Sequence, residues 1–226
     1  MARRSQGDGS LDRGAWVLAA RDAFEKGGVA AVRIEVLARN LEATPGSFYW
    51  HFKKREDLFD ALLADWKQAN MRSFEAASPA NVTAERRLID IAVSWINGTE
   101  FSSTYDAAIR DWARTSTKVA QIVRKIDARR VEILTNILSE YGLDEEESFI
   151  RARVMYFHQV GYYALKISES RDQRFELLSQ YFEVLVGRRM SADGAAYLAS
   201  QKQRGRGAKS NRIVERASAP SAAGEL

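Results

Sequence analysis

The sequence predicts an all-α protein. Its 226 residues are 46% hydrophobic and 28% charged, which is an ordinary globular composition. Only three prolines interrupt the chain, and runs of β-branched residues at period two are absent. Apolar residues recur instead at helical spacing through most of the chain. A protein of this length can bury a substantial core as one large domain or two modest ones.

The first expected helix runs from about residue 12 to residue 26, where Gly27 and Gly28 end it. The polar residues 1–11 before it are expected to form a flexible arm. A second, short helix covers residues 33–41, because Ile34, Leu37 and Leu41 fall on one face.

A third helix is expected immediately afterwards. Thr44 suits the N-cap and Pro45 the first helical position. Phe48 and Phe52 are four residues apart and can point inward together, whereas the three residues between them must face elsewhere. Two short helices joined by so tight a turn indicate a helix-turn-helix, with the second helix reading DNA.

The charge between residues 33 and 55 supports DNA binding, because five cations face only two acids there. Residues 27–66 resemble the DNA-binding domain of the tetracycline-repressor (TetR) family. The resemblance rests on Leu37-Ala38, on the run from Thr44 to Phe52, and on Arg55-Glu56-Asp57-Leu58. The sequence departs from the family in two places: Glu42 stands where a turn glycine is usual, and Pro45 where a lysine often precedes Gly46.

The expected DNA contacts divide into phosphate-positioning and base-reading groups. Arg55, Tyr49 and Ser47 are the expected phosphate contacts, whereas Trp50 and His51 are expected nearest the groove. The full predicted set is Arg33, Thr44, Pro45, Gly46, Ser47, Tyr49, Trp50, His51, Lys54 and Arg55.

Further helices are expected over the rest of the chain. A fourth begins near residue 54 and continues to about residue 76, and a break follows at 78–81. The later helices are expected at about 83–98, 105–115, 118–141, 144–167 and 170–187. Ser170 and Gln173 have the spacing of a capping box.

The last two of these helices are apolar on more than one side, so both must be buried on more than one side. A homodimeric four-helix interface would meet this need, and a thick monomer core is the alternative. The expected interface residues are Leu178, Tyr181, Phe182 and Leu185.

Aromatic and polar groups in this half of the chain suit a small-molecule pocket. The resemblance implies such a pocket, with effector binding releasing DNA. The candidate residues are Trp95, Trp112, Tyr156, His158, Gln159 and Tyr162. Core packing is the competing interpretation for each of them.

The expected domains are the arm 1–11, a DNA-binding domain 12–76, a regulatory and dimerisation domain 77–187, and a basic, disordered tail 188–226. Within the tail, residues 191–202 are compatible with one more helix. The net charge of +4 is concentrated at the reader helix and the tail.

Several function classes are excluded or disfavoured. The chain has no cysteine and only two histidines, and it lacks a phosphate-binding loop and a signal-peptide or membrane-span pattern. We therefore expect a cytoplasmic bacterial protein that is not an enzyme, with no cofactor, metal or membrane partner. Its expected partners are double-stranded operator DNA, a second copy of itself and a partly apolar effector.

The sequence thus predicts a homodimeric, ligand-responsive transcriptional repressor that binds a palindromic operator. The alternative is a helical DNA-binding architectural or scaffold protein without effector control.

Overall fold

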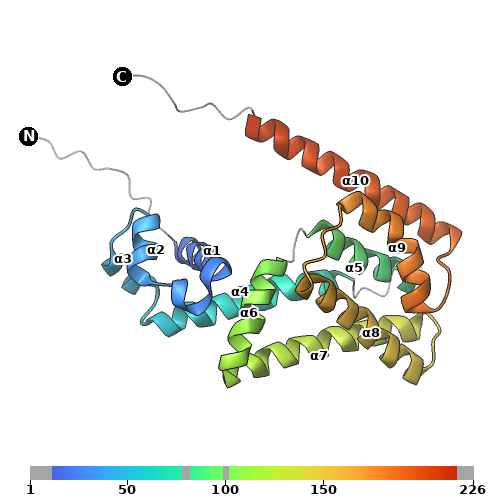
Figure 1. The fold of residues 1–226 in the computed structure, drawn as a ribbon, viewed down its shortest axis with the longest axis horizontal. Coiled ribbons are helices and arrows are strands. Elements are labelled where there is room, and N and C mark those ends of the chain that lie inside the picture. The colour runs from blue at the N-terminus through green and yellow to red at the C-terminus, as the bar shows by residue number, and fades with distance from the viewer. Residues whose placement is uncertain (1–11, 78–81, 99–101, 218–226) are drawn as a thin grey trace, which may run out of the picture. The chain divides into compact units, whose positions relative to one another are not determined.

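The computed structural model describes residues 12–77, 82–98 and 102–217, with side chains described as far as Arg204. These residues form ten α-helices and no strand (Figure 1), which confirms the all-α prediction. The helices are α1 (Arg13–Ala31), α2 (Ile34–Asn40), α3 (Pro45–His51), α4 (Arg55–Ala76), α5 (Ala84–Asn97), α6 (Ser103–Thr115), α7 (Thr117–Glu140), α8 (Glu145–Ala164), α9 (Arg171–Val186) and α10 (Ala192–Ala217).

The chain divides into two compact units, one within Met1–Arg72 and Glu100–Arg129, the other within Ser73–Thr99 and Arg130–Leu226. The boundaries fall inside α4 and α7, so α6 and the first half of α7 belong to the first unit. The sequence had assigned both to the second domain. Tertiary contacts explain the difference: the Tyr105 hydroxyl of α6 donates to the Leu62 carbonyl at 2.7 Å, and the ring of Phe24 on α1 lies edge-on to that of Trp112 at 5.8 Å.

The first unit has a core of aromatic residues. Trp16, Phe24 and Phe48 are fully buried, and Phe52 is nearly so. The rings of Phe48 and Phe52 stack at 5.1 Å, and Trp16 meets Phe48 edge-on at 5.4 Å. Phe48 and Phe52 therefore do point inward together, which leaves the opposite side of α3 free.

Two turns position α2 and α3. The helical geometry of α1 breaks at Gly27 and at Gly28, whose φ is 62°, so the first helix stops where the sequence predicted. After α2, the Ala43 N–H donates to the Ala38 carbonyl at 2.8 Å and the Glu42 N–H to the Arg39 carbonyl at 3.1 Å. This is the Schellman arrangement, and it holds Glu42 at a φ of 53°, where glycine is the usual residue.

In the second unit, α5 supplies a buried apolar stripe that includes Leu88 and Ile91. Helix α9 packs against both α5 and α8 (Figure 1). The predicted capping box is present, because Ser170 and Gln173 exchange side chain-to-backbone hydrogen bonds at 3.2 and 2.8 Å.

Helix α10 begins within the predicted tail, where the sequence is compatible with a helix over residues 191–202, and it continues to Ala217. It packs on α5 and α9, and polar contacts fix its start. The Ser191 N–H donates to the buried Glu85 at 2.8 Å, and the Tyr197 hydroxyl donates to Asp90 at 2.7 Å. A Cβ at position 194 would lie 2.6 Å from a Glu85 oxygen, so any larger residue there would displace the Glu85 carboxylate. Sequence periodicity does not reveal an anchor between residues about a hundred positions apart.

Two further observations apply to the part of the chain that the structure describes. None of its helices is long and apolar enough to cross a membrane. It also contains no group of three or more His, Asp or Glu side chains placed to hold a metal ion. The expected arm 1–11 lies outside the described residues.

Candidate DNA-reading helix, ligand pocket and dimer face

The side of α3 opposite the aromatic core presents flat aromatic groups to solvent. Trp50 is 88% exposed and Tyr49 is 59% exposed, while His51 is half-buried beside them. Thr44 caps the helix by accepting from the Ser47 N–H at 3.3 Å, and the Ser47 hydroxyl returns a bond to the Thr44 carbonyl at 2.7 Å. Pro45 and Gly46 complete this exposed first turn.

Exposed cations follow α3 in the chain and stand at the start of α2. Lys53 and Lys54 are exposed, and Arg33 is exposed at the start of α2. The backbone N–H groups of both lysines donate to the Asp57 carboxylate at 3.0 and 3.2 Å, which fixes the segment between α3 and α4. Lys53, the first of the three consecutive cations after Phe52, is absent from the predicted contacts.

Arg55 differs from its lysine neighbours. Its Nε donates to the Val32 carbonyl at 3.0 Å, and an Nη donates to the Val29 carbonyl at 2.8 Å. The guanidinium also lies 4.8 Å from the centre of the Phe59 ring. These contacts hold the segment between α1 and α2 against α4. The half-buried guanidinium that the sequence predicted at a phosphate is therefore engaged in hydrogen bonds within the first unit.

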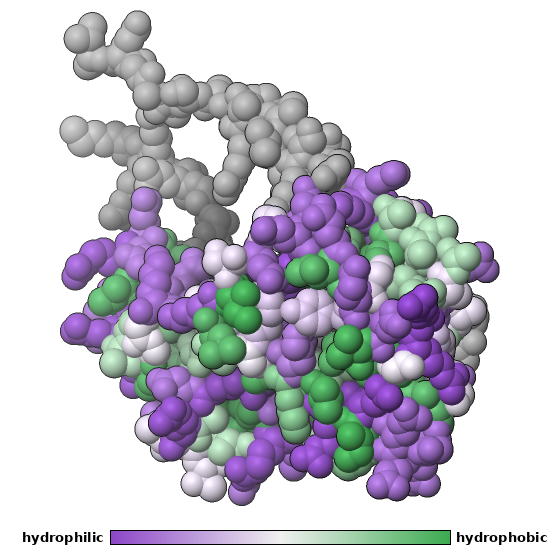
Figure 2. Space-filling model, turned by 45° about the vertical axis from the view of Figure 1, so that its right-hand side comes forward, coloured by the Kyte–Doolittle hydropathy of each residue, from purple (hydrophilic) through white to green (hydrophobic). Residues whose placement is uncertain are grey.

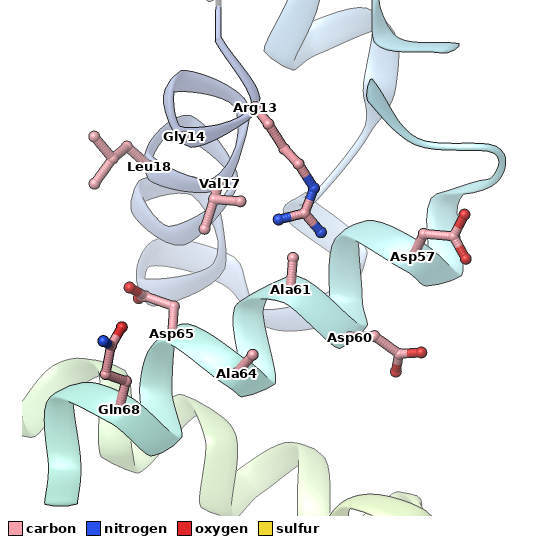
Figure 3. A pocket seen from close by; sticks show the side chains of 10 residues that line it. All are labelled: Arg13, Gly14, Val17, Leu18, Asp57, Asp60, Ala61, Ala64, Asp65 and Gln68. Atoms are coloured by element: carbon pink, nitrogen blue, oxygen red, sulfur yellow. The ribbon is translucent and has the colours of Figure 1, made fainter. Parts of the chain in front are cut away.

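A second feature of the first unit is an open groove between α1 and α4 (Figure 3). Its acidic lining is already paired. Asp57 caps α4, Asp60 accepts from Lys118 at 2.5 Å, and Asp65 lies 3.6 Å from Arg21. Leu18, which is exposed, is among the residues that line the groove in Figure 3. We assign no ligand to this groove.

The second unit contains a pocket between α5, α8 and α9, with a cavity of about 60 Å³. It brings together Trp95, His158, Gln159 and Tyr162, which are four of the six predicted ligand contacts. It also includes the four residues that the sequence predicted at the dimer interface, Leu178, Tyr181, Phe182 and Leu185. Leu178 and Phe182 are buried within their own chain.

The other two predicted ligand contacts lie elsewhere. Trp112 belongs to the first unit, where its ring packs against those of Phe24 and Phe59 at 5.8 and 5.2 Å. Tyr156 is buried on α8 and accepts a hydrogen bond from Arg130 at 2.9 Å. Both are packing residues, because the pocket forms on the side of α8 that faces α5 and α9.

Several polar groups line the pocket among its apolar walls. The Tyr162 hydroxyl donates to Glu169 at 3.0 Å, and burial is the main cause that raises the pKa of Tyr162. Arg174 donates to the Trp95 carbonyl at 3.0 Å and lies over the Tyr162 ring at 4.5 Å. Burial and then the Arg174 charge lower the pKa of His158, which keeps its imidazole neutral at pH 7.

The outward faces of α8 and α9 carry a set of exposed apolar residues, which we call the dimer face. Its members recur at helical spacing, and Val184 is the most exposed of them at 74%. Figure 2 shows exposed hydrophobic side chains, in green, between hydrophilic ones on the side that it draws. The face consists of Ile150, Val154, Phe157, Leu177, Tyr181 and Val184. The sequence predicted an interface on these two helices, but apolar residues on all sides of α9 concealed which side is internal.

The DNA-binding part of the chain is similar to a known protein family. Residues 17–62 match the family model described as bacterial regulatory proteins, tetR family. This segment contains α2, α3 and the first part of α4.

Several solved structures share the fold. A transcriptional regulator from Rhodococcus sp. RHA1 is 18% identical, with a TM-score of 0.61 over 78% of this chain and 95% of that one. A TetR-family regulator from Marinobacter aquaeolei VT8 is 14% identical, with a TM-score of 0.61 over 86% and 98%. The ketosteroid transcriptional regulator KstR2 of Mycobacterium tuberculosis is 17% identical, with a TM-score of 0.54 over 77% and 93%.

The matched segment holds the whole helix-turn-helix, and the fold extends the likeness to both units. Proteins of this family regulate transcription by binding DNA and are not enzymes, as the sequence predicted. Residues 17–62 therefore match the tetR-family model over the whole helix-turn-helix, and the chain shares the fold of solved transcriptional regulators.

Proposed function

We propose that this protein is a homodimeric repressor that binds a palindromic operator through α3 and leaves it when a small molecule enters the pocket of the second unit. The single observation that carries the proposal is the outer face of α3. There Trp50 and Tyr49 stand exposed beside Lys53 and Lys54, on a helix held from behind by a buried aromatic core.

Each residue of that face has a role in the proposal. Lys53, Lys54 and Arg33 neutralise phosphates, and Ser47 and Tyr49 donate hydroxyl groups to the backbone. Trp50 and His51 meet base edges in the major groove, because they continue the same face without a fixed positive charge. Thr44, Pro45 and Gly46 set the start of the helix. Arg55 supports the domain from inside.

The dimer face supports the two-fold part of the proposal. A two-fold dimer uses the same patch on both subunits. Helices α8 and α9 pack against each other, and both carry exposed apolar residues. Two identical reader helices require an inverted repeat whose half-sites are spaced by about 34–36 Å or a multiple of it. Chromosomal operator DNA as partner implies a location in the bacterial cytoplasm.

The pocket supports ligand control. It combines apolar walls with a few polar groups, which is usual for small-molecule sites. Its α8 and α9 also carry the dimer face. A ligand that moves α8 or α9 would therefore also change how the two subunits are oriented.

Selection from random duplex DNA with the full-length protein tests the DNA-binding part. We expect an inverted repeat, bound by two protomers, with affinity that falls steeply as salt rises. An asymmetric single half-site, or a preference for single-stranded DNA, would contradict the proposal.

The effector part needs its own measurement. Small molecules that displace a hydrophobic dye from the protein are titrated into the operator complex, and DNA release is followed by fluorescence anisotropy. We expect the displacing compounds to release the operator. Displacement without release would favour a DNA-binding scaffold protein that lacks effector control.

A further inference from the structure

We infer that the pocket between α5, α8 and α9 selects a compact, uncharged, largely apolar molecule with one hydrogen-bond acceptor oxygen, and that Nε2 of Gln159 holds this oxygen. The inference rests on the proposed ligand response and specifies its chemistry.

Gln159 provides the central observation. Its side chain lines the pocket and is only 6% exposed, yet its Nε2 has no hydrogen-bond partner among the described residues. A buried amide donor without a partner loses its water without compensation, so a ligand oxygen that accepts from it gains binding energy. The same amide discriminates against a molecule of equal shape that lacks the oxygen.

Two other hydrogen-bonding groups of the pocket are already occupied. The Tyr162 hydroxyl is committed to Glu169, and Arg174 donates to the Trp95 carbonyl. A ligand that bonded to Tyr162 or Arg174 would have to break one of these hydrogen bonds, and the former partner would be left buried and unpaired. Gln159 offers a donor for which nothing has to be broken.

Charge and size narrow the ligand further. Arg174 and Glu169 carry opposite charges at the same pocket, so a charged ligand would meet one attractive and one repulsive group in a poorly hydrated space. The cavity of about 60 Å³ is several times the roughly 10–15 Å³ that one water needs. Leu88, Met155 and Phe182 form apolar walls. A small ring with one carbonyl group fits this description.

Cyclohexanone and methylenecyclohexane form a matched pair of probes, because they differ only in carrying an oxygen or a methylene group. Binding of each to the full-length protein is measured by isothermal titration calorimetry. We compare the wild type with Gln159→Leu, which keeps a similar shape and removes the donor. The ratio of the two affinities should shift toward the hydrocarbon by tenfold or more in Gln159→Leu.

Gln121→Leu is the matched control, because it makes the same chemical change on the exposed surface of α7. It should leave the affinity ratio unchanged. Thermal unfolding of the ligand-free variants checks folding, and Gln159→Leu should be at least as stable as the wild type because it removes an unpaired buried group.

The outcomes separate this inference from the proposed function. If both probes bind and Gln159→Leu leaves their ratio unchanged, the assignment of Gln159 is wrong while the pocket stands. If neither probe nor a hydrophobic dye binds the wild type, both the inference and the ligand response fail.

Discussion

The outer face of α3 and the dimer face of α8 and α9 both expose large apolar side chains, but their neighbours differ. Trp50 is 88% exposed on a helix that Lys53 and Lys54 follow in the chain, whereas Val184 is 74% exposed in a surface groove that it shares with Ile150, Val154 and several charged side chains. Aliphatic groups gain only from another apolar surface. Aromatic rings among cations can meet phosphates and base edges. The neighbours of an exposed apolar residue, rather than its exposure, therefore indicate the partner.

The largest expected effect concerns the dimer face. Val184→Glu places a carboxylate in the proposed interface twice, once from each subunit, and each uncompensated buried charge costs about 3–5 kcal/mol. Sedimentation at micromolar concentration should show about twice 25.5 kDa for the wild type and 25.5 kDa for the variant. Leu18→Glu, at an exposed leucine of the first unit, is the control and should stay dimeric. A monomeric wild type would remove the basis of the comparison.

Arg55→Ala tests whether Arg55 stabilises the first unit, rather than binding a DNA phosphate as the exposed lysines are proposed to do. Loss of the bonds to the Val29 and Val32 carbonyls should lower the free energy of unfolding by about 2–3 kcal/mol, measured by denaturant titration. The slope of DNA affinity against salt should stay unchanged.

Lys54→Ala is the control for Arg55→Ala, because its side chain is exposed. It should change the free energy of unfolding by less than about 0.5 kcal/mol and reduce the salt slope by roughly one. The opposite pattern, with the slope reduced by Arg55→Ala, would restore the phosphate contact that the sequence predicted.

Trp50→Ala examines the aromatic part of the reader face. Loss of a base-reading contact should reduce the preference for operator over scrambled DNA by about 1–3 kcal/mol, with little change in the salt slope. Anisotropy titrations of both duplexes at several salt concentrations measure this. Equal weakening on both duplexes would make Trp50 a backbone contact.

The smallest expected effect lies in the turn before α3. Glu42 has a φ of 53°, so Glu42→Gly should raise the free energy of unfolding by about 0.5–1 kcal/mol in thermal or denaturant unfolding. Glu35→Gly within α2 is the matched control and should lower it by about 1 kcal/mol. Destabilisation by both changes would show that the Glu42 side chain makes a compensating contribution.

Local signals determined much of this protein. Caps, glycines and apolar spacing fixed where most helices start and stop, because these signals act over three or four residues. The stacking of Phe48 on Phe52 follows from their spacing, and so does the exposure of the residues between them. The run from Thr44 to Phe52 was enough to identify the helix-turn-helix.

Only the tertiary structure decided which side chains from different helices contact one another. The direction of Arg55, the place of Trp112 in the first unit and the burial of Leu178 depend on residues far away in sequence. The anchoring of α10 by Glu85 is of the same kind. A helix that is apolar on several sides does not encode which side meets its own chain and which meets a partner. That choice is made by the packing of all the helices together, because burial is non-directional and rewards any apolar surface that fits.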